Sequence, residues 1–373
     1  MIAPRVAVVG VHGHGATHVR HVARLAAAGR ARLVAVADPR PPADEFPGVA
    51  VYPDLTALLA ETEIDVAVIS TPIQTHAALA ELALRAGADV LLEKPPTASL
   101  ADFSRLLSVV EQTGRSCQVG FQAAGSHAAR ALASMVAEGQ LGEVRGISSV
   151  GTWVRTAQYW QRARWAGRRT LDGVAVVDGA VTNAFAHATA AALMIDGSPR
   201  ADQVRSVETE LFRANPIESD DTSTVRTITT RGTTVLTALT LCAAEHDGEP
   251  AIIVHGSTTR AVLRYSHDRL ELTTKGETTV TQYERDDLLE NLLDHRQNPD
   301  VPLLGPLAAT GAFTQVLEAV RLADPPTEIP ANQIRWEGND LQRHPIVLNV
   351  EHWVTRAAED LALFTELGAP WAR

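Results

Sequence analysis

Several residue types and segments are scarce in this chain of 373 residues. It has two cysteines, Cys117 and Cys242, which lie far apart and form no CxxC pair, so a disulfide scaffold and a cysteine-based zinc site are excluded. No apolar run approaches the ~18–20 residues that cross a bilayer, so we expect no membrane partner. The short apolar run Val6–Val9 leads directly into a glycine-rich loop, so we expect no signal peptide and a cytoplasmic protein.

Positive charge is also in deficit. The chain has 33 basic and 44 acidic side chains and a formal net charge of −11, so we expect no nucleic-acid partner. Lysine is rarer still: Lys94 and Lys275 are the only two, and the other 31 basic residues are arginine. Because arginine does not deprotonate in proteins, a retained lysine hints that a compact, titratable amine is needed.

Residues 1–122 alternate between short apolar runs and helical patterns. Asp54 and Ser99 are candidate helix caps, and Gly87 and Gly114 follow helical stripes as stop signals. Apolar runs bounded by turn residues are typical of strands buried on both faces. The pattern predicts a doubly wound parallel sheet, an α/β Rossmann domain. Its expected strands are Val6–Val9, Leu33–Ala37, Ala50–Tyr52, Val66–Ser70, Val90–Glu93 and Cys117–Gly120.

Residues 123–373 follow a different pattern and predict an α+β domain with a large, mostly antiparallel open sheet. Short runs rich in threonine and valine recur between residues 204 and 283, which indicates antiparallel strands. Helices are expected at 126–138, 306–322 and 347–367. The acidic residues Glu218, Asp220 and Asp221 lie in a loop before a strand, which is expected to be a solvated turn, with a substrate-facing loop as the alternative. The chain length agrees with two domains.

A glycine-rich loop connects the first strand to a helical pattern. Such a loop allows close backbone approach to a pyrophosphate at the helix N-terminus. Asp38 ends the second strand, where a carboxylate accepts hydrogen bonds from an adenosine ribose and repels a 2′-phosphate. We therefore expect NAD, with NADP disfavoured although Arg40 would soften that repulsion. The expected phosphate-loop residues are Gly10, His12, Gly13, His14 and Gly15, with His12 where a GxGxxG loop has its second glycine.

Four histidines, His12, His14, His18 and His21, lie in and just after this loop. Three of them have the spacing of one helix face, which suggests a metal site. No cysteine or carboxylate joins them in sequence, so we expect loop packing and a solvated helix face, and no metal.

Four motifs of residues 1–122 together resemble the glucose–fructose oxidoreductase / inositol dehydrogenase / MocA (Gfo/Idh/MocA) family. The most specific is Glu93-Lys94-Pro95-Pro96 after the fifth strand; the others are the glycine loop, Thr71-Pro72 with His76, and Val119-Gly120-Phe121-Gln122. The resemblance implies that Lys94 lies beside the nicotinamide and the substrate hydroxyl. It further implies a cofactor-binding set that adds Ser70, Thr71, Pro72, His76, Glu93, Lys94 and Gln122 to the loop, Asp38 and Arg40.

The family's second motif is an acid or amide four residues before a histidine, here Asn183 and His187. On a helix both side chains would project from one face. The family frequently has aspartate where this chain has Asn183. Since an amide cannot act as a base, acid–base chemistry would fall on His187 and Lys94. Aromatic and arginine residues just before this motif, a composition that suits stacking on sugar rings, are expected to bind substrate: Tyr159, Trp160, Arg164 and Trp165.

The resemblance implies an NAD(P)-dependent dehydrogenase that transfers a hydride between nicotinamide and a secondary hydroxyl or keto carbon of a sugar or cyclitol. Lys94, His187 and Asn183 would be the catalytic residues, and all three would also touch the substrate. A homodimer or homotetramer is expected through the open sheet face. The alternatives are a non-catalytic NAD(P)-binding regulator, a retained-cofactor enzyme that cleaves glycosides, and a sugar-binding protein on the same fold.

Overall fold

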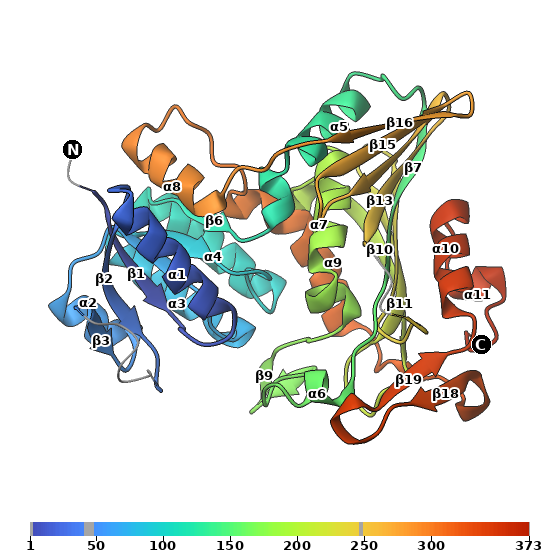
Figure 1. Cartoon of the computed structure of the whole chain (residues 1–373), viewed down its shortest axis with the longest axis horizontal. Helices are drawn as coiled ribbons and strands as arrows, with labels where there is room; N and C mark the ends of the chain where they lie inside the picture. Colours follow the sequence, from blue (N-terminus) through green and yellow to red (C-terminus); the bar gives the residue numbers. More distant parts are fainter. Residues whose placement is uncertain (1–2, 41–47, 246–248, 373) are drawn as a thin grey trace. The chain divides into compact units, whose positions relative to one another are not determined.

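The computed structural model describes residues 3–40, 48–245 and 249–372 and divides into two compact units (Figure 1). The first consists of Met1–Gly120 and Asp287–Leu307, and the second of Phe121–Asp286 and Ala308–Arg373. Each unit has its own sheet, so each is described separately below.

The first unit is built on a six-stranded sheet in the order β3-β2-β1-β4-β5-β6, and every pairing in it is parallel. This confirms the predicted doubly wound domain. The central strands β1, β4 and β5 are buried along nearly their whole length, as expected for apolar runs covered on both faces. The strands are β1 Arg5–Val9, β2 Arg32–Ala37, β3 Ala50–Tyr52, β4 Val66–Ile69, β5 Asp89–Leu92 and β6 Cys117–Val119.

Helices connect these strands, and the predicted caps form. The Asp54 side chain accepts from the backbone N–H of Ala57, and the Ser99 hydroxyl accepts from that of Asp102. Gly114 ends its helix in the left-handed conformation. The helices are α1 His14–Ala27, α2 Leu55–Glu61, α3 His76–Arg85 and α4 Leu100–Thr113.

Residues 287–307 belong to the first unit, although they follow most of the second unit in sequence. A single boundary after residue 122 does not include this return. The buried amide of Gln118 explains the return, since it donates to the carbonyl of Leu288 and accepts from the backbone N–H of Gly305. The segment contains α8, Leu288–Gln297.

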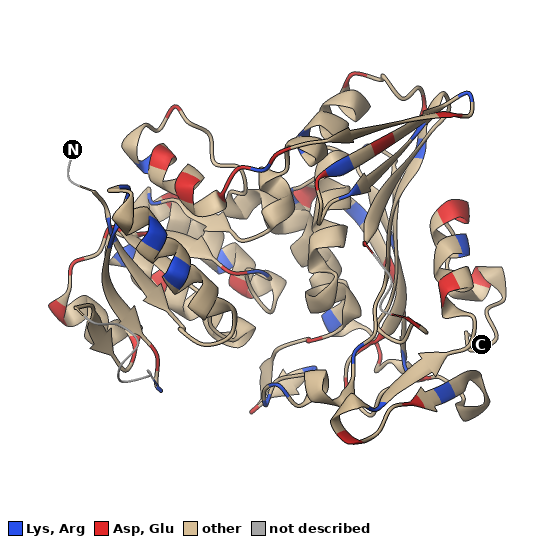
Figure 2. Ribbon diagram, in the orientation of Figure 1, with Lys and Arg blue, Asp and Glu red and all other residues tan. Residues whose placement is uncertain are grey.

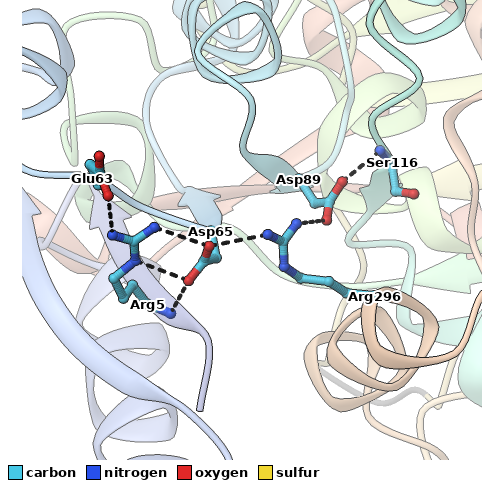
Figure 3. A network of polar contacts seen from close by, with 6 residues as sticks. All are labelled: Arg5, Glu63, Asp65, Asp89, Ser116 and Arg296. Atoms are coloured by element: carbon cyan, nitrogen blue, oxygen red, sulfur yellow. Dashed lines mark hydrogen bonds and ion pairs between the residues drawn. The ribbon is translucent and has the colours of Figure 1, made fainter. Parts of the chain in front are cut away.

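Arg296 on α8 ties this segment to the strands of the first sheet (Figure 3). Its guanidinium donates to Asp65 before β4 at 3.1 Å and to Asp89 on β5 at 2.5 Å. Asp65 also accepts from the backbone and side chain of Arg5 on β1. One cation thus links the amino ends of neighbouring strands, a contact between positions more than 200 apart in sequence.

The order of the first sheet reverses between β1 and β4, which is where open α/β sheets bind ligands. Two glycines let the backbone close up at this point. A Cβ on Gly10 would lie 2.3 Å from the carbonyl oxygen of Ser70, and one on Gly15 would lie 2.0 Å from that of Gly10. Real Cβ atoms do not approach backbone oxygens so closely, so both positions need glycine.

The second unit contains a nine-stranded sheet in the order β16-β15-β14-β13-β7-β12-β11-β10-β17. Only the β7–β12 and β10–β17 pairs are parallel among the pairings of the described strands, so the sheet is mostly antiparallel, as predicted. The strands are β7 Val144–Thr152, β10 Val204–Arg213, β11 Thr222–Thr229, β12 Thr234–Thr240, β13 Ala251–Gly256, β14 Thr259–Arg264, β15 Arg269–Thr274, β16 Glu277–Gln282 and β17 Thr327–Glu328. Two small ladders pair β8 Thr170–Leu171 with β9 Val174–Ala175, and β18 Ile334–Glu337 with β19 His344–Val347.

Helices cover both faces of the large sheet (Figure 1). On one face lie α5 His127–Ala137, α7 Ala186–Ile195 and α9 Gly311–Leu322, over a core that includes Leu132, Phe185 and Val316. On the other lie α10 Val350–Asp360 and α11 Phe364–Leu367, and the short helix α6, Ala157–Trp160, follows β7.

The single helix predicted over 347–367 was wrong. Val347 ends β19, and α10 stops at Asp360 because Leu361 adopts the left-handed conformation. The chain then turns so that Leu363 and Phe364 enter the core beneath the two helices.

Acidic and basic residues are interspersed over both units (Figure 2). No helix within the described part of the chain has the length and apolar character needed to span a membrane.

Gly15→Ala is expected to lower the free energy of unfolding by about 3 kcal/mol, because the new methyl group meets the Gly10 carbonyl and the backbone must move. Urea unfolding followed by circular dichroism measures this change. Gly114→Ala is the matched control, since its Cβ meets nothing within 4 Å and its left-handed conformation costs alanine only about 1 kcal/mol. Equal losses in both variants would contradict the close approach.

Candidate functional site

Asp38 and the loop after β1 form one hydrogen-bonded unit. The Asp38 carboxylate accepts from the backbone N–H of Val11 at 3.0 Å and from that of Arg40 at 2.9 Å. Asp38 is 8% exposed, so it is held in one position at the carboxyl end of β2. The Arg40 side chain is exposed beside it. The carboxylate is therefore fixed next to the glycine loop.

His12, which stands at the second glycine position, lies over this carboxylate. Its Nε2 is 2.6 Å from the Arg40 carbonyl oxygen and 3.6 Å from an oxygen of Asp38. Half of its side chain is exposed, so the ring leans against the loop from the solvent side.

The loops after β4 and β5 are linked through His76. Its Nδ1 lies 2.8 Å from the Pro95 carbonyl oxygen, and its Nε2 lies 2.8 Å from that of Thr71. Burial lowers the pKa of His76, so the neutral ring donates to one of these carbonyls. His76 is 2% exposed, and its contacts make it a brace between the two loops. Ser70 and Thr71 are half-buried, and Pro72 is exposed.

Glu93, at the end of β5, accepts from two histidines of α1. Its Oε1 is 2.8 Å from Nε2 of His18 and 3.2 Å from Nε2 of His14. Burial alone would raise the pKa of Glu93, but these two contacts outweigh it and hold the pKa well below its usual range. The same contact raises the pKa of His14 above 6.5. These three side chains form an ionic clasp between α1 and the segment after β5 that carries Lys94.

Within the part of the chain that the structure describes, two groups of side chains have the composition of metal ligands, and in each the structure adds carboxylates that are remote in sequence. Glu93 joins His14 and His18, and Asp287 and Glu290 join His21. Nothing local in the sequence could have found these groups, because β5 and α8 are remote from α1. In the first group the carboxylate already contacts both imidazoles at hydrogen-bond distance, so direct imidazole–carboxylate contacts account for the geometry.

Lys94 follows Glu93 and is half-buried. Its backbone N–H donates to the Glu93 carboxylate at 3.2 Å, and the Lys94–Pro95 peptide is cis. The lysine is thus held between the Glu93 clasp on one side and the His76 brace on the other.

In the second unit, Asn183 and His187 do not share one regular helix. Asn183 lies in a wide π-type turn, Ala180–Ala184, and His187 lies in α7. Phe185 interrupts the two because its buried ring stacks on Trp153 at 4.2 Å and packs against Gly151. The single regular helix that would place Asn183 and His187 on one face is therefore interrupted.

His187 and Asn183 are both half-buried. The His187 ring packs edge-on against Phe121, with ring centroids 5.7 Å apart. Gln122, which follows Phe121, is exposed at the start of a short turn, Gln122–Gly125, in the same unit.

Asp178 is a buried carboxylate that the sequence analysis missed. It accepts from the Asn183 amide, from the Arg162 guanidinium at 2.8 Å and from the backbone N–H of Gly167 at 2.8 Å. The contact with Asp178 fixes the orientation of the Asn183 amide. Its position five residues before Asn183 is the only sequence signal that could have found it.

The prediction of a solvated turn was wrong for Asp220 and Asp221. Asp220 and Asp221 are fully buried, and burial raises the pKa of each. Asp220 accepts from the backbone N–H of Val181 in the turn that carries Asn183, and Asp221 holds Asn215. Glu218 is exposed.

The four residues expected to stack on sugar are mostly engaged within the protein. Tyr159 lies between two arginines, with the Arg162 guanidinium 3.7 Å from its ring centroid. Arg162 also covers Trp165 at 4.6 Å, and Arg164 pairs with Asp172 at the surface. Trp160 differs, since it lines a cavity.

Comparison with known proteins agrees with this architecture. Residues 4–121 match the Gfo/Idh/MocA family model, which is described as an oxidoreductase family with an NAD-binding Rossmann fold. The resemblance predicted from the motifs of residues 1–122 is thereby confirmed, and the first domain is an NAD-binding Rossmann domain of this family.

Similar curated proteins include a 1-carboxy-3-chloro-3,4-dihydroxycyclohexa-1,5-diene dehydrogenase of Comamonas testosteroni, 32% identical over 147 residues, which are 38% of this chain and 37% of that protein. An inositol 2-dehydrogenase of Rhizobium meliloti is 33% identical over 142 residues, 37% of this chain and 43% of that protein. These matches thus span about two fifths of the relatives' length.

The whole architecture has solved counterparts. The WlbA dehydrogenase from Bordetella pertussis, in complex with NADH and UDP-GlcNAcA, superposes with a TM-score of 0.70 at 20% identity, covering 85% of this chain and 95% of that one. The likeness confirms the fold of both units.

We expect the titration midpoint of His14 to lie above pH 6.5 and to fall when Glu93→Gln removes its carboxylate partner. The fold favours the protonated ring, so this contact stabilises the protein fully below about pH 6.5 and is lost as the pH rises through the raised pKa. Imidazole proton shifts in NMR spectra between pH 5 and 9 measure both values. The control is Glu290→Gln, because Glu290 on α8 lies near His21, which is on α1 like His14. This variant should leave the titration midpoint of His14 unchanged. An unshifted His14 in the unaltered protein would refute the clasp.

Proposed function

We propose that this protein is an NAD-dependent oxidoreductase that transfers a hydride between nicotinamide and a secondary hydroxyl or keto carbon of a sugar or cyclitol. The observation that carries the proposal is the arrangement in the first unit. A glycine loop, a fixed Asp38 and Lys94 follow strands β1, β2 and β5, all at the carboxyl edge of a parallel sheet.

The residues of the first unit fit a dinucleotide. Gly10 and Gly15 let the loop pack tightly at the N-terminus of α1, where backbone N–H groups favour a pyrophosphate. Asp38 offers a carboxylate to the adenosine ribose. His76 would act indirectly, by holding the two loops that it joins. The proposed cofactor set is completed by Ser70, Thr71, Pro72, Glu93, Lys94 and Gln122. NAD, when bound, supplies the hydride acceptor or donor.

We propose that the reacting hydroxyl group of the substrate is bound by Lys94, His187 and Asn183. In the oxidising direction His187 accepts the hydroxyl proton, directly or through Lys94, and the Lys94 amine donates a hydrogen bond to the forming carbonyl oxygen. Asn183, whose amide is held by Asp178, would help to orient the substrate hydroxyl. Edge-on packing against Phe121 supports His187 by limiting how its ring turns.

The substrate class rests on names of relatives, which include inositol 2-dehydrogenases and a dehydrogenase crystallised with a nucleotide sugar. We further propose a cytoplasmic homodimer or homotetramer. The exposed edge strand β16, with Val280 59% exposed, supports association because unpaired strand edges bind partners readily. Light scattering of the purified protein decides between these states and a monomer.

Lys94→Ala and His187→Ala are each expected to lower kcat about 100-fold or more, because each removes a proton-transfer or hydrogen-bonding group at the reacting oxygen. NADH binding should stay within a few-fold of the unaltered protein. The measurements are NADH formation with a panel of sugars and cyclitols, including myo-inositol, and NADH fluorescence titration.

Lys275→Ala is the matched control, since this other lysine lies in the turn between β15 and β16. The double variant should lose much less than the product of the two single losses if both groups serve one step. Activity at the unaltered level in either single variant would refute these roles. Tight NADH binding with no turnover of any panel member would favour a regulator.

Asp38→Asn is expected to reduce the preference for NADH over NADPH about tenfold or more, because it removes a negative charge beside the ribose position while keeping a hydrogen-bond acceptor. The two dissociation constants, from fluorescence titration, give the ratio. Arg40→Gln tests the opposite sign, since losing this exposed cation should weaken NADPH binding more than NADH binding. An unchanged ratio in Asp38→Asn would refute the assignment.

A further inference from the structure

A cavity of about 870 Å³ lies within the second unit. Its walls come from three stretches of the chain: residues 157–168, 213–218 and 328–343. The volume lies within the range of small-molecule sites, ~300–1,000 Å³. Neither Asn183 nor His187 lines this cavity, so it is distinct from the proposed catalytic residues of the same unit.

The cavity wall carries an excess of positive charge. Arg168 and Arg213 each face a glutamate of the wall, Glu218 at 3.5 Å and Glu328 at 2.6 Å. Arg343 forms no ion pair with any residue of the described ranges. Its guanidinium instead lies 4.6 Å from the ring centroid of Trp336. One arginine is therefore positioned by an aromatic ring and not neutralised by a carboxylate.

Two tryptophans supply flat apolar surfaces. Trp336 is 41% exposed although it is a large aromatic side chain, and Trp160 packs against Gly167. Both rings line the cavity and can pack against a bound molecule.

We propose that this cavity binds an anionic carbohydrate, with its carboxylate or phosphate on the Arg343 guanidinium and its ring against the tryptophans. A guanidinium recognises either anion through paired N–H donors. The C–H faces of a sugar suit indole rings, and its hydroxyl groups suit the neighbouring arginines and glutamates.

A hydrogen-bonded chain connects this cavity to the proposed catalytic residues of the same unit. Gly167 lines the cavity, its backbone N–H donates to Asp178, and Asp178 accepts from the Asn183 amide. The proposal therefore rests on the proposed function and narrows its substrate class: the cavity holds the charged end of a substrate whose hydroxyl reacts elsewhere.

The test is isothermal titration calorimetry in saturating NAD⁺ with D-glucuronate, D-glucose 6-phosphate and uncharged D-glucose. At least one anionic sugar should bind about tenfold or more tightly than glucose, and the stronger of the two identifies the anion as carboxylate or phosphate. Arg343→Gln should abolish this advantage. Arg356→Gln is the matched control, because Arg356 also lies over a tryptophan, Trp353, but outside the cavity.

Equal binding of glucose and the anions, no binding of any of the three, or an advantage that survives Arg343→Gln would each overturn the proposal. Thermal unfolding of both variants shows whether they fold. Failure here with NADH binding intact leaves the proposed oxidoreductase standing. Failure of NADH binding, measured separately, removes the proposed function while the calorimetry still decides whether the cavity takes an anionic sugar.

Discussion

The close approach of two backbone segments, at Gly10 and Ser70, is the constraint on which the first unit depends. The order of the parallel sheet reverses between β1 and β4, and the chain leaves β1 where a Cβ on Gly10 would touch the Ser70 carbonyl oxygen. Gly15 meets Gly10 in the same way. The loop therefore packs closely against the sheet, and the N-terminus of α1 lies at the carboxyl edge of the sheet. Asp38 then fixes the loop from the other side through the N–H of Val11.

Charge distribution around Lys94 follows from this framework. The pKa of Glu93 lies well below its usual range although most of its side chain is covered, because His14 and His18 on α1 both contact it. On the other side His76 joins the loops after β4 and β5. Three histidines, His14, His18 and His76, therefore position the segment after β5 that carries Lys94.

The second unit uses buried carboxylates in the same way. Asp178 gathers Asn183, Arg162 and Gly167, and Asp220 supports the π-type turn from below. A buried carboxylate is stable only when donors surround it, so each of these aspartates fixes several backbone segments at once. The wide turn and the interruption at Phe185 are consequences of that packing, and they set the orientations of Asn183 and His187 separately.

The sequence by itself determined the features that depend on neighbours along the chain. The alternation of apolar runs and capped helices predicted the parallel sheet, and the glycine loop with Asp38 and the Glu93-Lys94-Pro95 motif predicted the family of the first domain. Only the tertiary structure decided which remote residues meet. The return of α8 through Arg296, the contact of Glu93 with His14 and His18, the role of Asp178 and the cavity beside Trp160 all join positions without a common local pattern. Periodicity and turn chemistry act over a few residues, whereas long-range charge pairing and packing depend on how strands are ordered in a sheet, and that order has no local signature.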